Sequence, residues 1–152
     1  MASGHPSLDL DRRSPPPSSY VARRTMEANR RADTAPERHL RAAVHARGLR
    51  FRKDMRLVID GVAVRPDIVF TRARVAVFVD GCFWHRCPLH FQTPRANGEW
   101  WARKLDRNVA RDRRNDSALA AAGWAVVRAW EHEAPLGVAG RVEALVRSRQ
   151  ST

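Results

Sequence analysis

The spacing of apolar residues predicts both helices and strands in this chain. Apolar positions recur at helical spacing in three segments, from Thr34 to Gly48, from about Glu99 to Ala122, and around residues 138–146. Shorter strand-like runs lie between them, at residues 49–53, 57–59, 62–64, 67–70, 75–79 and 124–130. This order of helix, strands, helix, strand and helix predicts an α/β fold, with a mixed sheet between helices.

Capping and turn residues mark the ends of these elements. Thr34 suits the N-cap of the first helix, and Glu37 stands where a capping box places its acid. Asp60-Gly61 predicts a hairpin turn. Residues 1–24 are polar and rich in Pro and Ser, so they predict a disordered tail. The remaining chain, residues 25–149, is long enough for one folded domain.

The segment from Val75 to His90 concentrates the residues that can carry chemistry. It starts as an apolar strand, breaks at Asp80-Gly81, and then brings together both cysteines, two histidines and the pair Phe83-Trp84. Functional side chains are often found on loops that a rigid scaffold positions. We therefore expect a functional loop at the end of this strand.

Two thiols and two imidazoles could form a metal site. Cys82, Cys87 and His90 lie in the loop, and His132 follows a strand that can run beside the first one. Such a set suits a closed, tetrahedral Zn²⁺ site. The alternative is that the cysteines are buried apolar residues and His132 lies on the surface.

An acid and a histidine suggest hydrolytic chemistry. Asp67 stands at the start of an otherwise apolar strand. A carboxylate buried there needs a metal ion, an arginine or several hydrogen-bond donors as partners. It is a suitable Mg²⁺ ligand, and His85 is a suitable general base at neutral pH. Asp112 could orient the His85 ring. Metal-assisted attack on a phosphodiester needs such an acid and base close together.

The long helix has two faces of different character. Trp101, Leu105 and Val109 recur at helical spacing and are expected to face the sheet. Lys104, Asn108 and Asp112 are each four residues apart and therefore lie in a row on the neighbouring face. Such a row of different polar residues is more typical of a functional surface than of a face that is merely exposed to water. In the loop, Phe83 and Trp84 should point apart, either as wedges between base pairs or as a cover over the sheet edge.

Composition indicates a polyanionic partner. The formal net charge is +12, and almost all of the basic residues are arginines, which suit phosphate but can also reflect genomic composition. The apolar runs are too short for a membrane span, and neither a signal peptide nor a disulfide framework is evident. The expected setting is the reducing cytoplasm.

Four segments together resemble the very short patch repair (Vsr) mismatch endonucleases. They are GCFWHRCPLH, the strand with Arg65-Pro66-Asp67, the helix KLDRNVARDRR, and the strand ending Trp130-Glu131-His132. The resemblance runs from about Thr25 to Val146. It implies a variant of the restriction-endonuclease-like PD-(D/E)xK fold, with a mixed central sheet flanked by helices. It also implies nicking of DNA on the 5′ side of the T in a T:G mismatch, the product of 5-methylcytosine deamination.

The resemblance assigns roles to individual residues. Asp67, assisted by the backbone carbonyl of Val79, resembles the Mg²⁺ ligand. His85 resembles the general base, Asp112 its orienting partner, and Glu37 an acidic residue near the active site. The resemblance also gives matches for DNA contacts and for structural zinc: Met26, Phe83, Trp84, Lys104 and Asn108 for DNA, and Cys82, Cys87, His90 and His132 for zinc.

The chain also departs from related patterns. The lysine of the wider superfamily motif is absent after Asp80, which fits a histidine base, and His90 is shifted by about one residue from the third zinc ligand of some relatives. The expected enzyme is a monomer in the nucleoid-associated cytoplasm, acting on T:G-mismatched duplex, with accessory mismatch-repair proteins as further partners. The alternatives are a restriction-like endonuclease of the same fold and a non-catalytic, zinc-stabilised DNA-binding module.

Overall fold

The computed structural model describes residues 33–151. The predicted tail at residues 1–24 and the predicted DNA contact Met26 lie outside them. Helices and strands in the described part follow one another as α2 (Ala35–Ala46), β1 (Arg52–Lys53), β2 (Leu57–Ile59), β3 (Val62–Val64), β4 (Ile68–Phe70), β5 (Val75–Asp80), α3 (Gly98–Ala121), β6 (Ala125–Trp130) and α4 (Pro135–Gln150).

The central sheet is mixed, as the sequence predicts. Its strand order is β1-β4-β5-β6, with β4 antiparallel to both β1 and β5, and β6 parallel to β5. Asp80 at the end of β5 stands opposite Trp130 at the end of β6. The loops that follow these two strands therefore start side by side.

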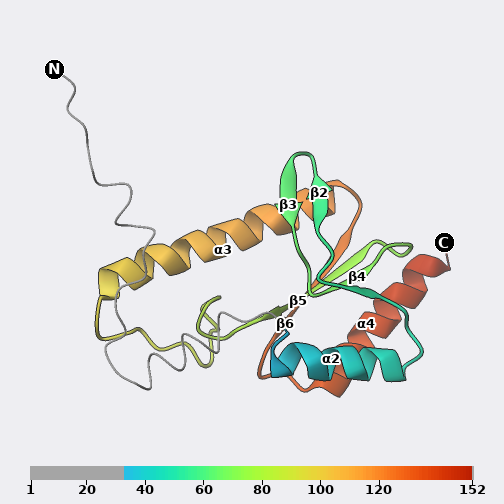
Figure 1. The fold of residues 1–152 in the computed structure, drawn as a ribbon, viewed down its shortest axis with the longest axis horizontal. Coiled ribbons are helices and arrows are strands. Elements are labelled where there is room, and N and C mark those ends of the chain that lie inside the picture. The colour runs from blue at the N-terminus through green and yellow to red at the C-terminus, as the bar shows by residue number, and fades with distance from the viewer. Residues whose placement is uncertain (1–32, 152) are drawn as a thin grey trace.

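Helices and a hairpin cover the two faces of this sheet (Figure 1). One face packs against α2 and α4, which also pack against each other, and its core includes Ile68, Val75 and Val77. The other face holds Ala76 and Phe78 under the β2–β3 hairpin and the end of α3. β5 is apolar because both of its faces are covered.

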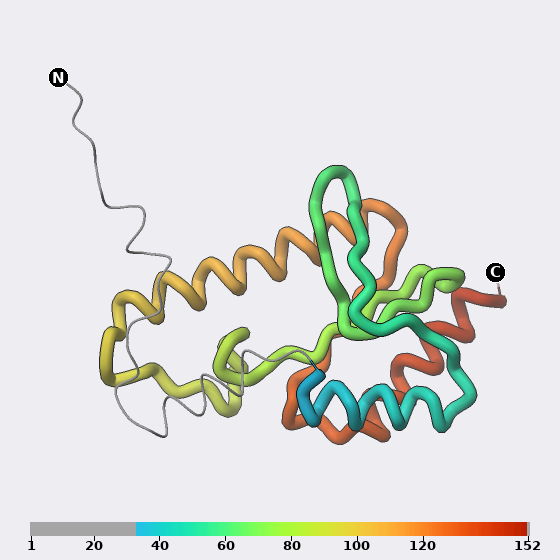
Figure 2. Tube along the Cα trace, viewed as in Figure 1, coloured from blue at the N-terminus to red at the C-terminus, as the bar shows by residue number. Residues whose placement is uncertain are grey.

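The first half of α3 extends beyond the sheet (Figure 2). The loop after β5 runs along it, and the ring of Trp101 contacts the ring of Phe83 at a centroid distance of 5.2 Å. The expectation that Trp101 faces the sheet is therefore wrong, although the residue is buried. Leu105 is buried as well, while Val109 is only half-buried. Helical periodicity identifies the buried face but not the segment that covers it.

Two element ends differ from the sequence expectation. The predicted strand at residues 49–53 is reduced to β1, whose two residues pair with Val69 and Ile68 of β4. Thr34 makes no side-chain cap at the start of α2. Instead, Glu37 accepts a hydrogen bond from the N–H of Asp33 at 2.9 Å. Within residues 33–151, no helix has the length and apolar character needed to cross a membrane.

Candidate active site and metal centre

The candidate site forms where β5 and β6 end and β4 begins. Because β4 is antiparallel to β5, Asp67 at its start lies beside the end of β5, and the Val79 N–H donates to its Oδ2 at 2.6 Å. The loops are joined as well. The N–H of Glu131 donates to the carbonyl of Asp80, and the N–H of Cys82 donates to the Glu131 carboxylate.

Three carboxylates gather on one side of this site. Glu37 from α2, Asp54 after β1 and Asp67 before β4 offer oxygen atoms that all lie within 4.8 Å of one another. All three are half-buried. Carboxylate oxygens at this spacing fit a hard divalent cation that keeps some of its water. The donor set is therefore chemically suited to Mg²⁺.

The pKa of Asp67 reflects this crowding. Burial raises it from 3.8 to about 7, and the neighbouring charges of Glu37, Asp54 and Asp80 add to the rise, while the hydrogen bond from the Val79 N–H opposes it. Burial also raises the pKa of Glu37. Without a cation, Asp67 keeps its proton up to about pH 7, whereas the unfolded chain would release it near pH 4. A bound cation would favour the ionised form.

On the side of the site opposite the three carboxylates, His85 faces Asp112. Its Nδ1 is hydrogen-bonded to Oδ2 of Asp112, and Oδ1 of Asp80 is 3.8 Å from the same nitrogen. Burial would raise the pKa of Asp112, but the hydrogen bond from His85 and the positive charge of Arg128 outweigh it, so the pKa is lowered. Since an ionised carboxylate only accepts, Nδ1 carries the hydrogen, and the neutral form of the ring has its lone pair on Nε2.

One open cleft connects these groups. Its volume is about 410 Å³, and Glu37, Val79, His85, Lys104 and Asn108 all line it. Asn108 also donates to the carbonyl of Trp84 at 3.4 Å. With Trp84, which also lines it, six of the sequence-predicted site residues lie at the same cleft. Asp67 and Asp112 do not line it, but they contact the lining residues Val79 and His85.

The predicted metal ligands Cys82, Cys87, His90 and His132 also come together. Their ligand atoms lie within 4.8 Å of one another. Sγ of Cys82 is 3.3 Å from Nδ1 of His132, and Sγ of Cys87 is 3.7 Å from Nδ1 of His132 and of His90. Ordinary zinc bond lengths in a tetrahedron give a sulfur–nitrogen edge of about 3.6 Å. These sulfur–nitrogen distances fit a tetrahedral metal ion held by the four side chains.

The surroundings of Cys87 fit a thiolate ligand. Burial would raise the pKa of this thiol, but backbone hydrogen bonds from Leu89 and His90 outweigh that effect, and the pKa is lowered. Both cysteines are free and buried. A buried thiolate that receives backbone hydrogen bonds is the form in which cysteine binds metal.

Five aromatic residues pack along the loop and the start of α3. The rings of Phe83 and Trp84 contact each other at 5.2 Å, and both contact Trp101. The expectation that Phe83 and Trp84 point apart is wrong, because the loop turns between them and Trp101 lies against both. Nζ of Lys104 lies 5.7 Å from the ring centre of Trp84 and 5.0 Å from that of Trp100. Phe91 completes the cluster beside Phe83.

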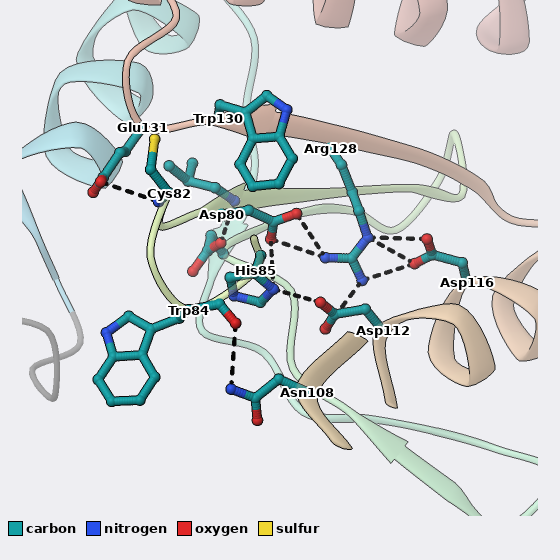
Figure 3. A network of polar contacts seen from close by, with 12 residues as sticks. Asp80, Cys82, Trp84, His85, Asn108, Asp112, Asp116, Arg128, Trp130 and Glu131 are labelled. Atoms are coloured by element: carbon teal, nitrogen blue, oxygen red, sulfur yellow. Dashed lines mark hydrogen bonds and ion pairs between the residues drawn. The ribbon is translucent and has the colours of Figure 1, made fainter. Parts of the chain in front are cut away.

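Sequence reasoning missed Asp54, Arg128 and Asp116, which all belong to this site. Asp54 follows a two-residue strand, and nothing in its surrounding sequence indicates that it meets Glu37 and Asp67. Arg128 does carry a signal, because it is the single charged residue in the apolar strand β6. Its guanidinium binds Asp80 and Asp116 behind His85 (Figure 3).

Comparisons with a family model and with individual proteins find the same group of DNA endonucleases. The family described as "DNA mismatch endonuclease Vsr" matches residues 20–89. A Type II nicking enzyme, V.NaeI of Lentzea aerocolonigenes, is 53% identical over 120 residues, which cover 78% of this chain and 72% of the relative.

Two further relatives extend the match. The Type II nicking enzyme V.XorIIP of Xanthomonas oryzae pv. oryzae is 39% identical over 140 residues, which cover 91% of this chain and 95% of the relative. The DNA mismatch endonuclease Vsr of Escherichia coli K12 is 40% identical over 111 residues, or 71% of this chain and 67% of the relative. The chain therefore belongs to the DNA mismatch endonuclease Vsr family.

Proposed function

We propose that this member of a DNA endonuclease family nicks duplex DNA on the 5′ side of the T in a T:G mismatch. The observation that carries the proposal is the single cleft that His85 and Glu37 both line, with Asp67 behind one side and Asp112 behind the other. Metal-assisted hydrolysis of a phosphodiester needs an acidic metal site and a base on the same substrate.

The acidic side would hold Mg²⁺. Asp67 is the proposed ligand together with the backbone carbonyl of Val79, and Glu37 and Asp54 are placed to bind the ion directly or through water. Bound there, Mg²⁺ would polarise the phosphate and stabilise the charge that develops as the bond breaks. The protein's own contribution is to keep these carboxylates close together despite their mutual repulsion.

His85 is the proposed general base. Its Nδ1–H is held by Asp112, so Nε2 can accept a proton from a water molecule in the cleft. The water oxygen then bonds to phosphorus, and the bond between phosphorus and one sugar oxygen breaks. The leaving sugar oxygen takes a proton from solvent water, and Nε2 later returns its proton to solvent. Asp112 fixes the tautomer and stabilises the imidazolium that forms.

The loop and α3 would hold the DNA. Phe83 and Trp84 are proposed to insert beside the mismatch, where unstacking costs a few kcal/mol and a mispair lowers that cost. Lys104 and Asn108 line the cleft and are proposed to contact the mismatch and the DNA backbone. Met26 is proposed to insert from the opposite groove, as the family resemblance implies.

A structural Zn²⁺ on Cys82, Cys87, His90 and His132 would fix the loop that carries His85. A PD-(D/E)xK-type fold and stimulation by accessory mismatch-repair proteins are proposed from the family resemblance. A monomer in the nucleoid-associated cytoplasm is proposed as well.

A nicking assay tests the proposed substrate. Two duplexes of the same length, one with a single T:G mismatch and one fully paired, carry different labels on their two strands and are incubated with protein and Mg²⁺. We expect a nick only in the T-containing strand of the mismatched duplex. Cleavage of both strands of the paired duplex would favour a restriction-like endonuclease, and binding without cleavage would favour a DNA-binding module.

Magnesium is expected to raise the melting temperature more at pH 8 than at pH 6. The pKa of Asp67 is about 7 in the metal-free protein, so protons compete with the cation for this carboxylate below that pH. Thermal melts with and without Mg²⁺ at both pH values measure the effect. Asp67→Asn should abolish it, whereas an equal Mg²⁺ shift at the two pH values would contradict the assignment.

A further inference from the structure

Arg128 has an unusual position for a charged side chain. It projects from the otherwise apolar edge strand β6, and its guanidinium carbon lies 4.1 Å from the ring centre of Phe78. Around it stand three carboxylates from two other elements, Asp80 at the end of β5 and Asp112 and Asp116 on α3 (Figure 3).

The guanidinium binds two of these acids strongly. Nη1 donates to both oxygens of Asp80, at 2.9 and 3.2 Å. Nε donates to both oxygens of Asp116, at 2.9 and 3.0 Å, and Nη2 donates to Oδ1 of Asp116 at 2.8 Å. Asp112 is farther away, with its Oδ1 3.8 Å from Nη2. The planar fork of arginine is well suited to hold two carboxylates at once.

Asp80 and Asp112 are competing acceptors for His85. The Oδ1 atom of Asp80, which accepts from Arg128, lies 3.8 Å from Nδ1 of His85. Asp80 is only 6% exposed, so water cannot easily replace a lost partner. If Arg128 released it, a small movement would bring Asp80 within hydrogen-bond distance of Nδ1. The imidazole ring would then turn away from Asp112, and Nε2 would move with it.

We propose that Arg128 is a positioning residue that holds Asp80 away from His85, so that Asp112 alone orients the imidazole ring. This inference rests on the proposed role of His85 as the general base. A purely stabilising role explains the network less well, because buried ion pairs contribute little net stability compared with well-packed apolar residues. A displacement of about 1 Å in a catalytic group can lower a rate about 100-fold.

Kinetics of Arg128→Gln test the inference. With a T:G duplex and Mg²⁺, we expect kcat to fall about 100-fold while KM stays within about twofold. Adding Asp80→Asn to this variant removes the competing charge. The kcat of the double variant should be at least about tenfold higher than that of Arg128→Gln. Arg147→Gln is the matched control, since Arg147 pairs with Glu143 on the exposed side of α4, and it should behave like wild type.

A second variant tests the inference even if Arg128→Gln does not fold. Asp116→Asn weakens the other anchor of Arg128, and the side chain of Asp116 is 37% exposed, so folding should survive. We expect a fall in kcat of about tenfold with KM unchanged and a wild-type circular dichroism spectrum. Unchanged kcat in folded Arg128→Gln and Asp116→Asn, or a double variant no faster than Arg128→Gln, would overturn the inference. A wild-type protein that does not nick would instead refute the proposed function.

Discussion

Replacing Asp112 with asparagine is expected to lower the single-turnover nicking rate by about 10²- to 10⁴-fold. Asp112 accepts the Nδ1–H of His85, which leaves Nε2 free to take a proton. An asparagine amide can donate to Nδ1 instead. The ring would then carry its hydrogen on Nε2 and could not act as a base, although its position would hardly change.

Rates at saturating T:G duplex and DNA affinity by fluorescence anisotropy separate chemistry from binding. Affinity should stay within about twofold, because Asp112 lies behind His85 and does not line the cleft. Asp106→Asn is the control, since Asp106 lies on the same helix but pairs with Arg86 on the exposed side. An Asp112→Asn enzyme that keeps a tenth or more of the wild-type rate would contradict the orienting role.

Cys82→Ser is expected to unfold or aggregate the protein instead of leaving a stable, inactive enzyme. Loss of one of four ligands should lower the free energy of unfolding by about 4 kcal/mol or more, because structural zinc contributes to folding directly. The loop from Cys82 to His90 covers the start of α3 through the contacts of Phe83 with Trp101, so its release would also expose that aromatic cluster.

Melting temperature and metal content are measured together. Wild type should carry one equivalent of zinc, and Cys82→Ser should carry much less. Removal of zinc from wild type with a chelator serves as the control, and it should reproduce the lowered melting temperature without any substitution. A Cys82→Ser protein with the wild-type melting temperature would exclude a structural zinc.

The spacing of apolar and turn residues along the sequence is sufficient to predict much of the fold. The apolar run of β5 follows from its burial on both faces, and the helical spacing of α2 and α3 follows from the faces they bury. The predicted hairpin turn at Asp60-Gly61 is confirmed between β2 and β3. These features depend on residues close together in sequence, whose spacing records the geometry of the backbone.

Contacts between distant segments were harder to predict. Nothing near Asp54 indicates that its carboxylate meets Glu37 and Asp67, because the three come from separate elements that only the complete sheet brings together. The helical spacing of Trp101 predicts a buried face but not its partner, which is the loop after β5 and not the sheet. Arg128 could have been recognised as a lone charge in a core strand, but its three acidic neighbours could not.

The central claim is that an acid and a base on the two sides of one cleft act on the same phosphodiester. The most direct measurement compares wild type, Asp67→Asn and His85→Ala on a labelled T:G duplex, with nicking and DNA binding recorded in the same samples. Our account predicts that all three fold and bind the duplex with similar affinity, and that both variants lose the nick at the T, with a rate loss for His85→Ala of about 10²- to 10⁴-fold. Wild-type nicking by either folded variant would contradict it.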